Sequence, residues 1–381
     1  MGDLTAILIA LRNTPFRQLL IEETNGDLRQ ESTLSGIAEQ FGRNVQDKPY
    51  LRSARNTLTM GEVANDQRPH HLSQVLTGAM FDILIRLSKY YVAVRNRTVP
   101  EAFWNTIQRM QNLAIQPLDL LPPVDVTFRD YALAVLRADE TNSPTDPDDY
   151  RGMMLDAFIE RGILGEPDRV ALRAPHHVFE RLELDVFYDI ETIASSAADA
   201  YRFLDDNRRK LFIPPNADVI VTDLASAQKL TRQARRLPRQ VLLQYVWRED
   251  VVLEGPRFGR FDGHTTQLLC GGTLAFNQNG EMLAWARKPG SQPIGAGQDA
   301  VGEQAKGVAR REEFLAVLAR RIKTGRIGAA VGSERGLLAR STPPLTSRTV
   351  DGTVRFELSP HFGIHDDEQD EQGGRTWQIS S

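Results

Sequence analysis

Cysteine is almost absent from this sequence of 381 residues, because Cys270 is the only one. A single thiol excludes an internal disulfide and any zinc site built from several thiolates. It also fits a reducing compartment, so the predicted location is cytoplasmic. An excess of one charge is missing too, since 46 Lys and Arg stand against 50 Asp and Glu. The net charge of −4 gives no reason to expect nucleic acid or a membrane surface as a partner.

The sequence also has no long apolar run. The first apolar stretch, residues 4–11, is short, follows Asp3 and has no basic segment before it. It is therefore neither a signal peptide nor a membrane span. Its apolar residues recur at helical spacing from the start, with no capping residue before them. This abrupt start predicts that the natural protein extends further upstream.

A metallopeptidase motif of the form His-Glu-x-x-His is absent as well. His361 and His365 have the four-residue spacing that places two imidazoles on one face of a helix. Pro360 and Gly363 disfavour a helix there, and no glutamate follows His361. The sequence therefore predicts no metal ligands in this chain.

The most informative stretch that is present runs from Asn65 to Val92. A polar loop that ends at Pro69 leads into His70 and His71, and apolar residues then recur at intervals of three and four. This pattern predicts a helix of five or six turns that starts at the histidines. A histidine there, with Asp66 just upstream, is a candidate transition-state stabiliser that the aspartate would orient. The alternative is an ordinary pair of surface histidines in a helix-entry loop.

The patterns along the chain predict a mainly α fold in four parts. The predicted parts are a helical lobe (1–115), a helical extension (116–215), a small β-rich domain (216–290), and a linker, basic helix and mostly disordered tail (291–381). One helix of the first part is expected from about Ser32 to Phe41.

Strand formers are concentrated between residues 216 and 290. Asn277–Gly280 lies between two such runs and predicts a β-hairpin. Gly271–Gly272 falls inside a strand pattern and favours a bulge or a close backbone approach. A basic helix is expected near 308–323, with a solvated face rather than a nucleic-acid patch. The acidic run 366–371 is expected to be disordered.

Three segments of the first part together resemble the C-terminal helical lobe of the gluzincin zinc metallopeptidases, the thermolysin-like and fungalysin-like group. Gly2–Asp3–Leu4–Thr5 resembles the second half of the family's Glu-x-x-x-Asp motif. Tyr50–Leu51–Arg52–Ser53 resembles its Leu-Arg-Ser segment, and Pro69–His70–His71–Leu72–Ser73 resembles its His-x-x-Ser helix entry. The order and the rough spacing of the three segments match jointly.

The resemblance implies a role for each matching residue. Asp3 would orient a zinc-ligating histidine, Arg52 would bind a substrate carbonyl, and His70 would stabilise the tetrahedral intermediate, with His71 as the alternative. Asp66, or Asn65 if the register is strict, would orient that histidine. The family's ligand glutamate would fall two residues before Met1. Zinc serves the intact family, but this chain is expected neither to bind it tightly nor to hydrolyse peptides.

Two functions from different classes follow. The chain is either the C-terminal region of a gluzincin-like metallopeptidase, with a peptide or protein substrate, or a non-catalytic helical module that binds a protein partner. The peptidase hypothesis requires Asp3, Arg52 and His70 to converge on one cleft. It also predicts an exposed apolar surface where a second lobe would lie.

Overall fold

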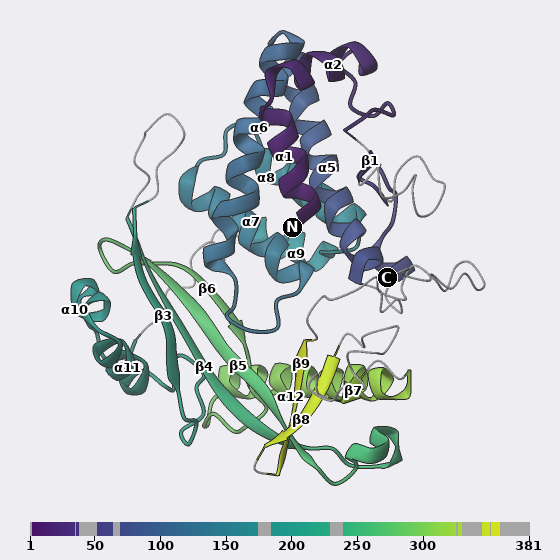
Figure 1. Ribbon diagram of the computed structural model, residues 1–381. Helices are drawn as coiled ribbons and strands as arrows, with labels where there is room; N and C mark the ends of the chain where they lie inside the picture. Colours follow the sequence, from purple (N-terminus) through teal and green to yellow (C-terminus); the bar gives the residue numbers. More distant parts are fainter. Residues whose placement is uncertain are drawn as a thin grey trace, which may run out of the picture.

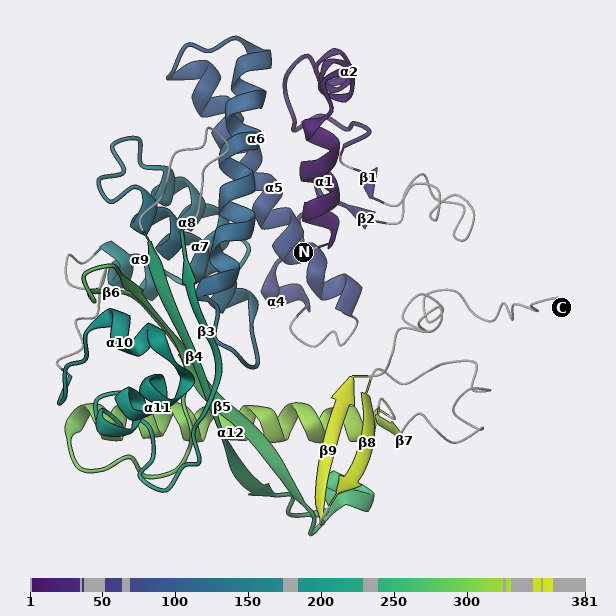
Figure 2. The same cartoon turned by 60° about the vertical axis from the view of Figure 1, so that its left-hand side comes forward.

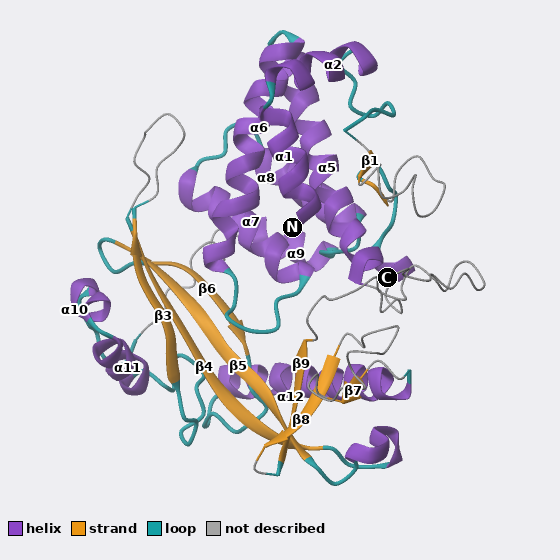
Figure 3. Cartoon of the chain, viewed as in Figure 1, coloured by secondary structure: helices purple, strands orange, loops and turns teal. Residues whose placement is uncertain are grey.

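The computed structural model describes residues 2–34, 36–37, 52–63, 69–173, 184–228, 239–324, 327–329, 345–350 and 352–358. These residues form a helical lobe that stands on a long, twisted sheet (Figures 1 and 3). None of the helices in these ranges combines the length and the apolar composition that a membrane span requires.

The helical lobe occupies the first part of the chain. Its elements are α1 (Gly2–Arg12), α2 (Thr14–Thr24), the short strands β1 (Gly36–Ile37) and β2 (Arg52–Ser53), α4 (Met60–Val63), α5 (Pro69–Ala93), α6 (Val99–Ile115), the 3-10 helix η2 (Gln116–Leu120), α7 (Phe128–Asn142), α8 (Tyr150–Glu160) and α9 (Glu166–Arg173).

Local sequence explains where these helices begin. The predicted helix after Pro69 is α5, and its apolar positions are buried as the periodicity indicates. Helix α7 begins with a capping box, in which Thr127 accepts from the backbone N–H of Asp130 and the Asp130 carboxylate accepts from the N–H of Thr127. The expected helix from Ser32 to Phe41 is wrong within the described residues, because Gly36–Ile37 pairs with Arg52–Ser53 as a two-stranded ribbon.

Buried side chains group into two large cores. The first extends from Leu4 to Leu164 and includes residues of α1, α5, α6, α7 and α8. The second extends from Ile190 to Val354 and includes residues of the sheet and of the helices packed on it. The limits of these cores do not coincide with the predicted domain boundaries at 115 and 215.

The second part of the chain is built on a seven-stranded mixed sheet. Its strands are β3 (Ile220–Ala227), β4 (Gln240–Val252), β5 (Thr265–Asn277), β6 (Met282–Lys288), β7 (Ile327–Ala329), β8 (Leu345–Val350) and β9 (Thr353–Leu358). The order is β3-β4-β5-β9-β8-β7, and β6 also pairs with β5. Strands β4 and β5 pair antiparallel along their whole length of 13 residues each.

This sheet makes the predicted mainly α class wrong. The β part is not a small domain limited to 216–290, because β7, β8 and β9 come from the region predicted as linker and tail. Strand β4 is buried on both faces over most of its length, so its sequence lacks the alternation that marks a half-exposed strand. The predicted hairpin is present between β5 and β6. The acidic run 366–371 lies outside the described residues.

Helices cover the sheet. Helices α10 (Ile190–Ser195) and α11 (Ala197–Asp206) pack beside β3, the 3-10 helix η3 (Pro256–Phe261) follows β4, and α12 (Gln298–Lys323) crosses the strands (Figures 1 and 2). Helix α12 begins ten residues before the expected position of the basic helix. Gly271 confirms the predicted close approach, because a Cβ there would lie 2.1 Å from the carbonyl oxygen of Tyr245.

Specific polar contacts join the helical lobe to the sheet. The Lys288 ammonium of β6 lies 2.6 Å from the Asp130 carboxylate at the start of α7. The Thr273 hydroxyl of β5 donates to the carbonyl of Leu121 at 2.6 Å. Arg310 of the basic helix is directed inward rather than to solvent, and its guanidinium lies 3.2 Å from the carboxylate of Asp125, which precedes α7. These contacts fix the orientation of the lobe on the sheet.

Candidate functional site

The residues predicted to form a site lie on three elements of the helical lobe. Asp3 is half-buried in the first turn of α1. The backbone of Arg52 belongs to β2, and the backbone of His70 belongs to the first turn of α5. The side chains of Arg52 and His70, and the whole of Asp66 and Asn65, lie outside the described residues.

The backbone brings the first turns of α1 and α5 to the same end of the lobe. Helix α6 follows α5 after a short connection and packs against it in the opposite direction, so Ile115 at its end lies toward the half of α5 where that helix begins. Thr5 and Ile9 of α1 line a groove with Ile115. The first turn of α1 is therefore at the end of the lobe where α5 begins, as Figures 1 and 2 both show.

A buried arginine, Arg161, links the segment that follows β2 to α5. Arg161 follows α8, and only 7% of the residue is exposed. Its guanidinium donates to the Asp82 carboxylate at 2.8 Å, to the side-chain oxygen of Asn56 at 3.1 Å and to the carbonyl of Leu58 at 3.0 Å. We call Arg161, Asp82 and Asn56 the Arg161 network.

Asn56 connects the Arg161 network to the backbone on either side of the predicted site. Its side-chain amide donates to the carbonyl of Ser53 in β2 and to the carbonyl of Gln74 in α5, both at 2.9 Å. Ser53 is the neighbour of Arg52, and Gln74 lies one turn after His70. The Arg161 network therefore holds the backbones of the predicted substrate-binding and intermediate-stabilising residues in a fixed relation.

The sequence patterns did not identify the Arg161 network. One signal for it is Gly78 in the middle of α5, where glycine is unfavourable in an ordinary helix. A Cβ at this position would lie 2.9 Å from the guanidinium of Arg161 and 3.0 Å from the side-chain oxygen of Asn56. The glycine makes room for the network against the helix backbone.

The titratable group of the Arg161 network whose pKa is shifted is the carboxyl of Asp82. Burial raises the pKa of Asp82, and the charge and hydrogen bonds of Arg161 act in the opposite direction. The net direction is upward, so burial outweighs the stabilisation that Arg161 gives to the Asp82 carboxylate.

The described residues do not fit a catalytic zinc site. In this part of the chain, no group of three or more His, Cys, Asp and Glu side chains is placed to hold a metal ion. A hydrolytic zinc site needs three protein ligands and an open position for water.

An apolar groove is open beside the first turns of α1. It lies between α1 and the end of α6 and has a volume of about 560 Å³. Three large apolar side chains around it are exposed, with 63% of Ile9, 61% of Ile115 and 40% of Leu118 accessible to solvent. We call this surface the α1–α6 groove. Its apolar rim is typical of an interaction site.

Comparison of the chain with models of known families, with curated proteins and with solved structures finds no match.

Proposed function

We propose that residues 2–173 act as the helical lobe of a gluzincin-like metallopeptidase, which binds the substrate while a second lobe provides the metal site. The observation that carries this proposal is the common location of three segments. Helix α1 and strand β2 both contact α5, and α1 and α5 contribute to one hydrophobic core.

In this proposal, the chain's own residues position a peptide and stabilise developing charge. Arg52 donates to a backbone carbonyl of the substrate, and charged His70 donates to the oxyanion of the tetrahedral intermediate. Asp66 orients His70, and Asp3 orients a histidine of the second lobe. The chain alone is not expected to hydrolyse peptides. We propose that the protein acts in the cytoplasm.

The α1–α6 groove supports a second lobe at this end. Ile9 and Ile115 expose most of their apolar surface beside the turn that carries Asp3. Burying such side chains against a partner would stabilise a complex, since each large apolar side chain contributes roughly 1.5–3 kcal/mol when it is fully buried.

The α1–α6 groove alone would equally suit the second candidate, a non-catalytic module that binds a protein partner. In that case Asp3, Arg52 and His70 have no common role. The two functions differ in whether these residues recognise one peptide-like ligand together.

A peptidyl phosphonamidate tests this difference, because its anionic phosphorus centre resembles the tetrahedral intermediate. We expect the phosphorus resonance of the ligand to shift on titration with the protein. Arg52→Ala and His70→Ala should each weaken binding about tenfold, since a hydrogen bond to a charged group contributes roughly 1.5–3 kcal/mol.

Arg55→Ala is the matched control for Arg52→Ala, because Arg55 is an exposed arginine in the adjacent turn. His71→Ala distinguishes the two possible histidines. Equal binding by the wild type and by the variants at 52, 70 and 71 would favour the interaction module. Hydrolysis of a peptide by the chain supplied with zinc would contradict the proposal that a second lobe provides the metal site.

A further inference from the structure

The sheet splits between β5 and β9, far along the chain from the predicted site. The two strands pair in parallel only at Thr265 with Thr353 and at Thr266 with Val354. Both strands continue beyond these pairs, and they diverge from the point where they meet (Figures 1 and 2). A cleft of about 370 Å³ lies at this split, within the usual range for ligand sites. We call it the β5–β9 cleft.

Much of the lining of the β5–β9 cleft is apolar. Leu268 of β5 and Val354 of β9 are only 2% and 1% exposed, so they belong to the hydrophobic core below the cleft. Two half-buried aromatic side chains also line it, Phe314 of α12 and Phe356 of β9. Such a surface favours an apolar group of a ligand, because contact with it removes apolar area from water.

The charged groups of the β5–β9 cleft are mostly positive. Among the described residues, three arginines and one carboxylate, that of Asp125, line it. Arg310 of α12 is the partner of this carboxylate, at 3.2 Å. Arg248 of β4 and Arg355 of β9 are exposed, and in the described part of the chain neither guanidinium has an ion-pair or hydrogen-bond partner. Two cations at the cleft are therefore left without an anion.

The neighbouring strand adds a further positive charge beside Arg355. Arg348 of β8 is directly opposite Arg355 in the antiparallel pair of β8 and β9. Residues in this relation have Cβ atoms roughly 4.5–5.5 Å apart on one face of the sheet, where like charges destabilise the pair. Arg348 is exposed too, and it has no carboxylate partner within the described ranges. A bound anion would relieve the repulsion between the two arginines.

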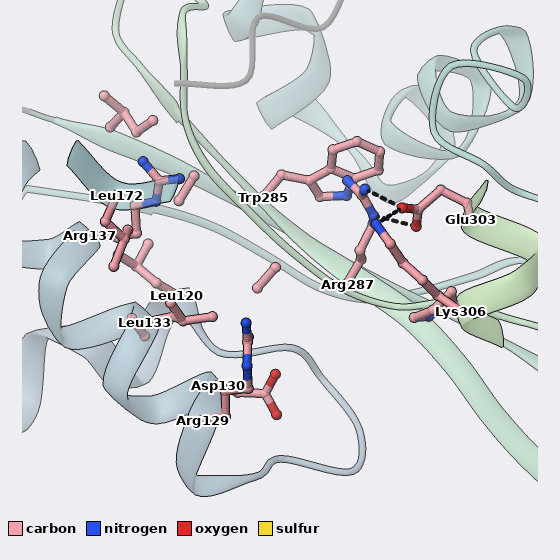
Figure 4. A pocket seen from close by; sticks show the side chains of 15 residues that line it. Leu120, Arg129, Asp130, Leu133, Arg137, Leu172, Trp285, Arg287, Glu303 and Lys306 are labelled. Carbon is pink, nitrogen blue, oxygen red and sulfur yellow. Dashed lines mark hydrogen bonds and ion pairs between the residues drawn. The ribbon is translucent and has the colours of Figure 1, made fainter. Parts of the chain in front are cut away.

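A groove between α7 and β6, with α12 along one side, gives the contrasting arrangement (Figure 4). There Arg287 and Lys306 both contact the Glu303 carboxylate, at 2.9 Å and 2.5 Å, and Arg129 pairs with Asp168. The cations of that groove thus have anionic partners within the chain. At the β5–β9 cleft, the anion for Arg248 and Arg355 has to come from a ligand.

We propose that the β5–β9 cleft binds a small amphipathic carboxylate, with its apolar chain against the buried lining and its carboxylate at Arg248 and Arg355. Arginine suits this head group because its planar guanidinium can donate two parallel hydrogen bonds to a carboxylate. The apolar chain supplies affinity, and the arginines select an anion over a cation. This site is independent of the proposed peptidase role, because it shares no residue with that site.

Isothermal titration calorimetry of the full chain with octanoate tests the proposal. We expect saturable binding with a Kd of about 0.1–1 mM, in keeping with a ligand of this size. Octylammonium has the same chain with a positive head group and should bind at least about tenfold more weakly. Acetate has the same head group without the long chain. It should also bind at least about tenfold more weakly, because it buries little apolar surface.

Arg248→Gln and Arg355→Gln should each weaken octanoate binding about tenfold, because each removes a charge-assisted hydrogen bond to the carboxylate. Arg257→Gln is the matched control, since Arg257 is an exposed arginine of η3 that does not line the cleft, and it should bind within about twofold of the wild type. No saturable binding, octylammonium binding as tight as octanoate binding, or equal effects of the three variants would overturn the proposal. Arg52→Ala should leave octanoate binding unchanged, so a failure here is distinguishable from a failure of the peptidase role.

Discussion

Replacing Arg161 by alanine is expected to lower the free energy of unfolding by about 3–5 kcal/mol at pH 7. The change leaves the Asp82 carboxylate, 26% exposed, without its cation, and it leaves the Asn56 oxygen and the Leu58 carbonyl without their donor. Urea unfolding followed by far-UV circular dichroism measures the change.

Arg86→Ala is the matched control, because Arg86 is one turn from Asp82 on α5 and pairs with Glu160 of α8 at the surface. Arg86→Ala should lower the free energy of unfolding by less than about 1 kcal/mol, because exposed ion pairs contribute little to stability. Equal losses for the two variants would show that the Arg161 network does not stabilise the lobe.

The loss caused by Arg161→Ala should become smaller as the pH falls. Burial already raises the pKa of Asp82 in the folded protein, and removing Arg161 raises it further. A carboxyl whose pKa is raised by folding binds its proton more readily in the folded state, so its contribution favours folding at low pH and is lost as the pH rises through the folded pKa. Once Asp82 is protonated, its neutral carboxyl gains little from the charge of Arg161, so removing Arg161 costs less. A loss that is independent of pH would assign the effect to Asn56 and Leu58 instead.

Gly307→Ala has the second-largest expected effect, about 3 kcal/mol of destabilisation. A Cβ at this buried position in α12 would lie 1.7 Å from the carbonyl oxygen of Gly290, so α12 or the chain after β6 must move. That chain is held in turn, because the backbone N–H of Ser291 donates to the buried Glu249 carboxylate at 2.7 Å. The same urea measurement applies.

Gly302→Ala is the control for this prediction. It lies on the same helix, it is exposed, and a Cβ there would have no neighbour within 4 Å. Alanine should stabilise α12 at this position by roughly 0.5–1 kcal/mol, because glycine lowers helix stability by that amount. A destabilisation by Gly302→Ala similar to that of Gly307→Ala would show that the contact with Gly290 is not the cause.

Local signals predicted the helices well because they depend on neighbouring residues. The apolar spacing after Pro69 identified α5. The turn at Asn277–Gly280 likewise identified the hairpin of β5 and β6. In each case the residues that determine the element lie within a few positions of one another.

The extent of the sheet could not be predicted in the same way. Strand β9 pairs in parallel with β5 through Thr265 and Thr353, which are far apart in the sequence and carry no local sign of their pairing. Strand β4 is nearly continuously buried, so its sequence resembles an apolar helix segment as much as a strand. The mainly α class was wrong chiefly because β7, β8 and β9 come from the region predicted as linker and tail.

The resemblance named Asp3, Arg52 and His70, and their roles stay a prediction; of the elements that carry their backbones, α1 and β2 both contact α5. The residues that fix these elements were missed. Arg161 reaches Asn56 across more than a hundred positions, and an arginine after a helix is usually solvated. Nothing near Arg161 in the sequence marks it as buried.

The central claim is that Asp3 and His70 face one cleft at the same end of the helical lobe, and the distance between them tests it most directly. Nitroxide labels on Asp3→Cys and His70→Cys can be measured by pulsed electron paramagnetic resonance. The native Cys270 is buried, and burial raises the pKa of its thiol to about 12, so it should remain unlabelled.

Asp3→Cys with Val92→Cys is the reference pair, because Val92 lies about 33 Å from His70 along the axis of α5. We predict a distance between labels 3 and 70 that is far shorter than the distance between labels 3 and 92. Similar distances for the two pairs would contradict the common cleft, and the protein-interaction module would then be the better account.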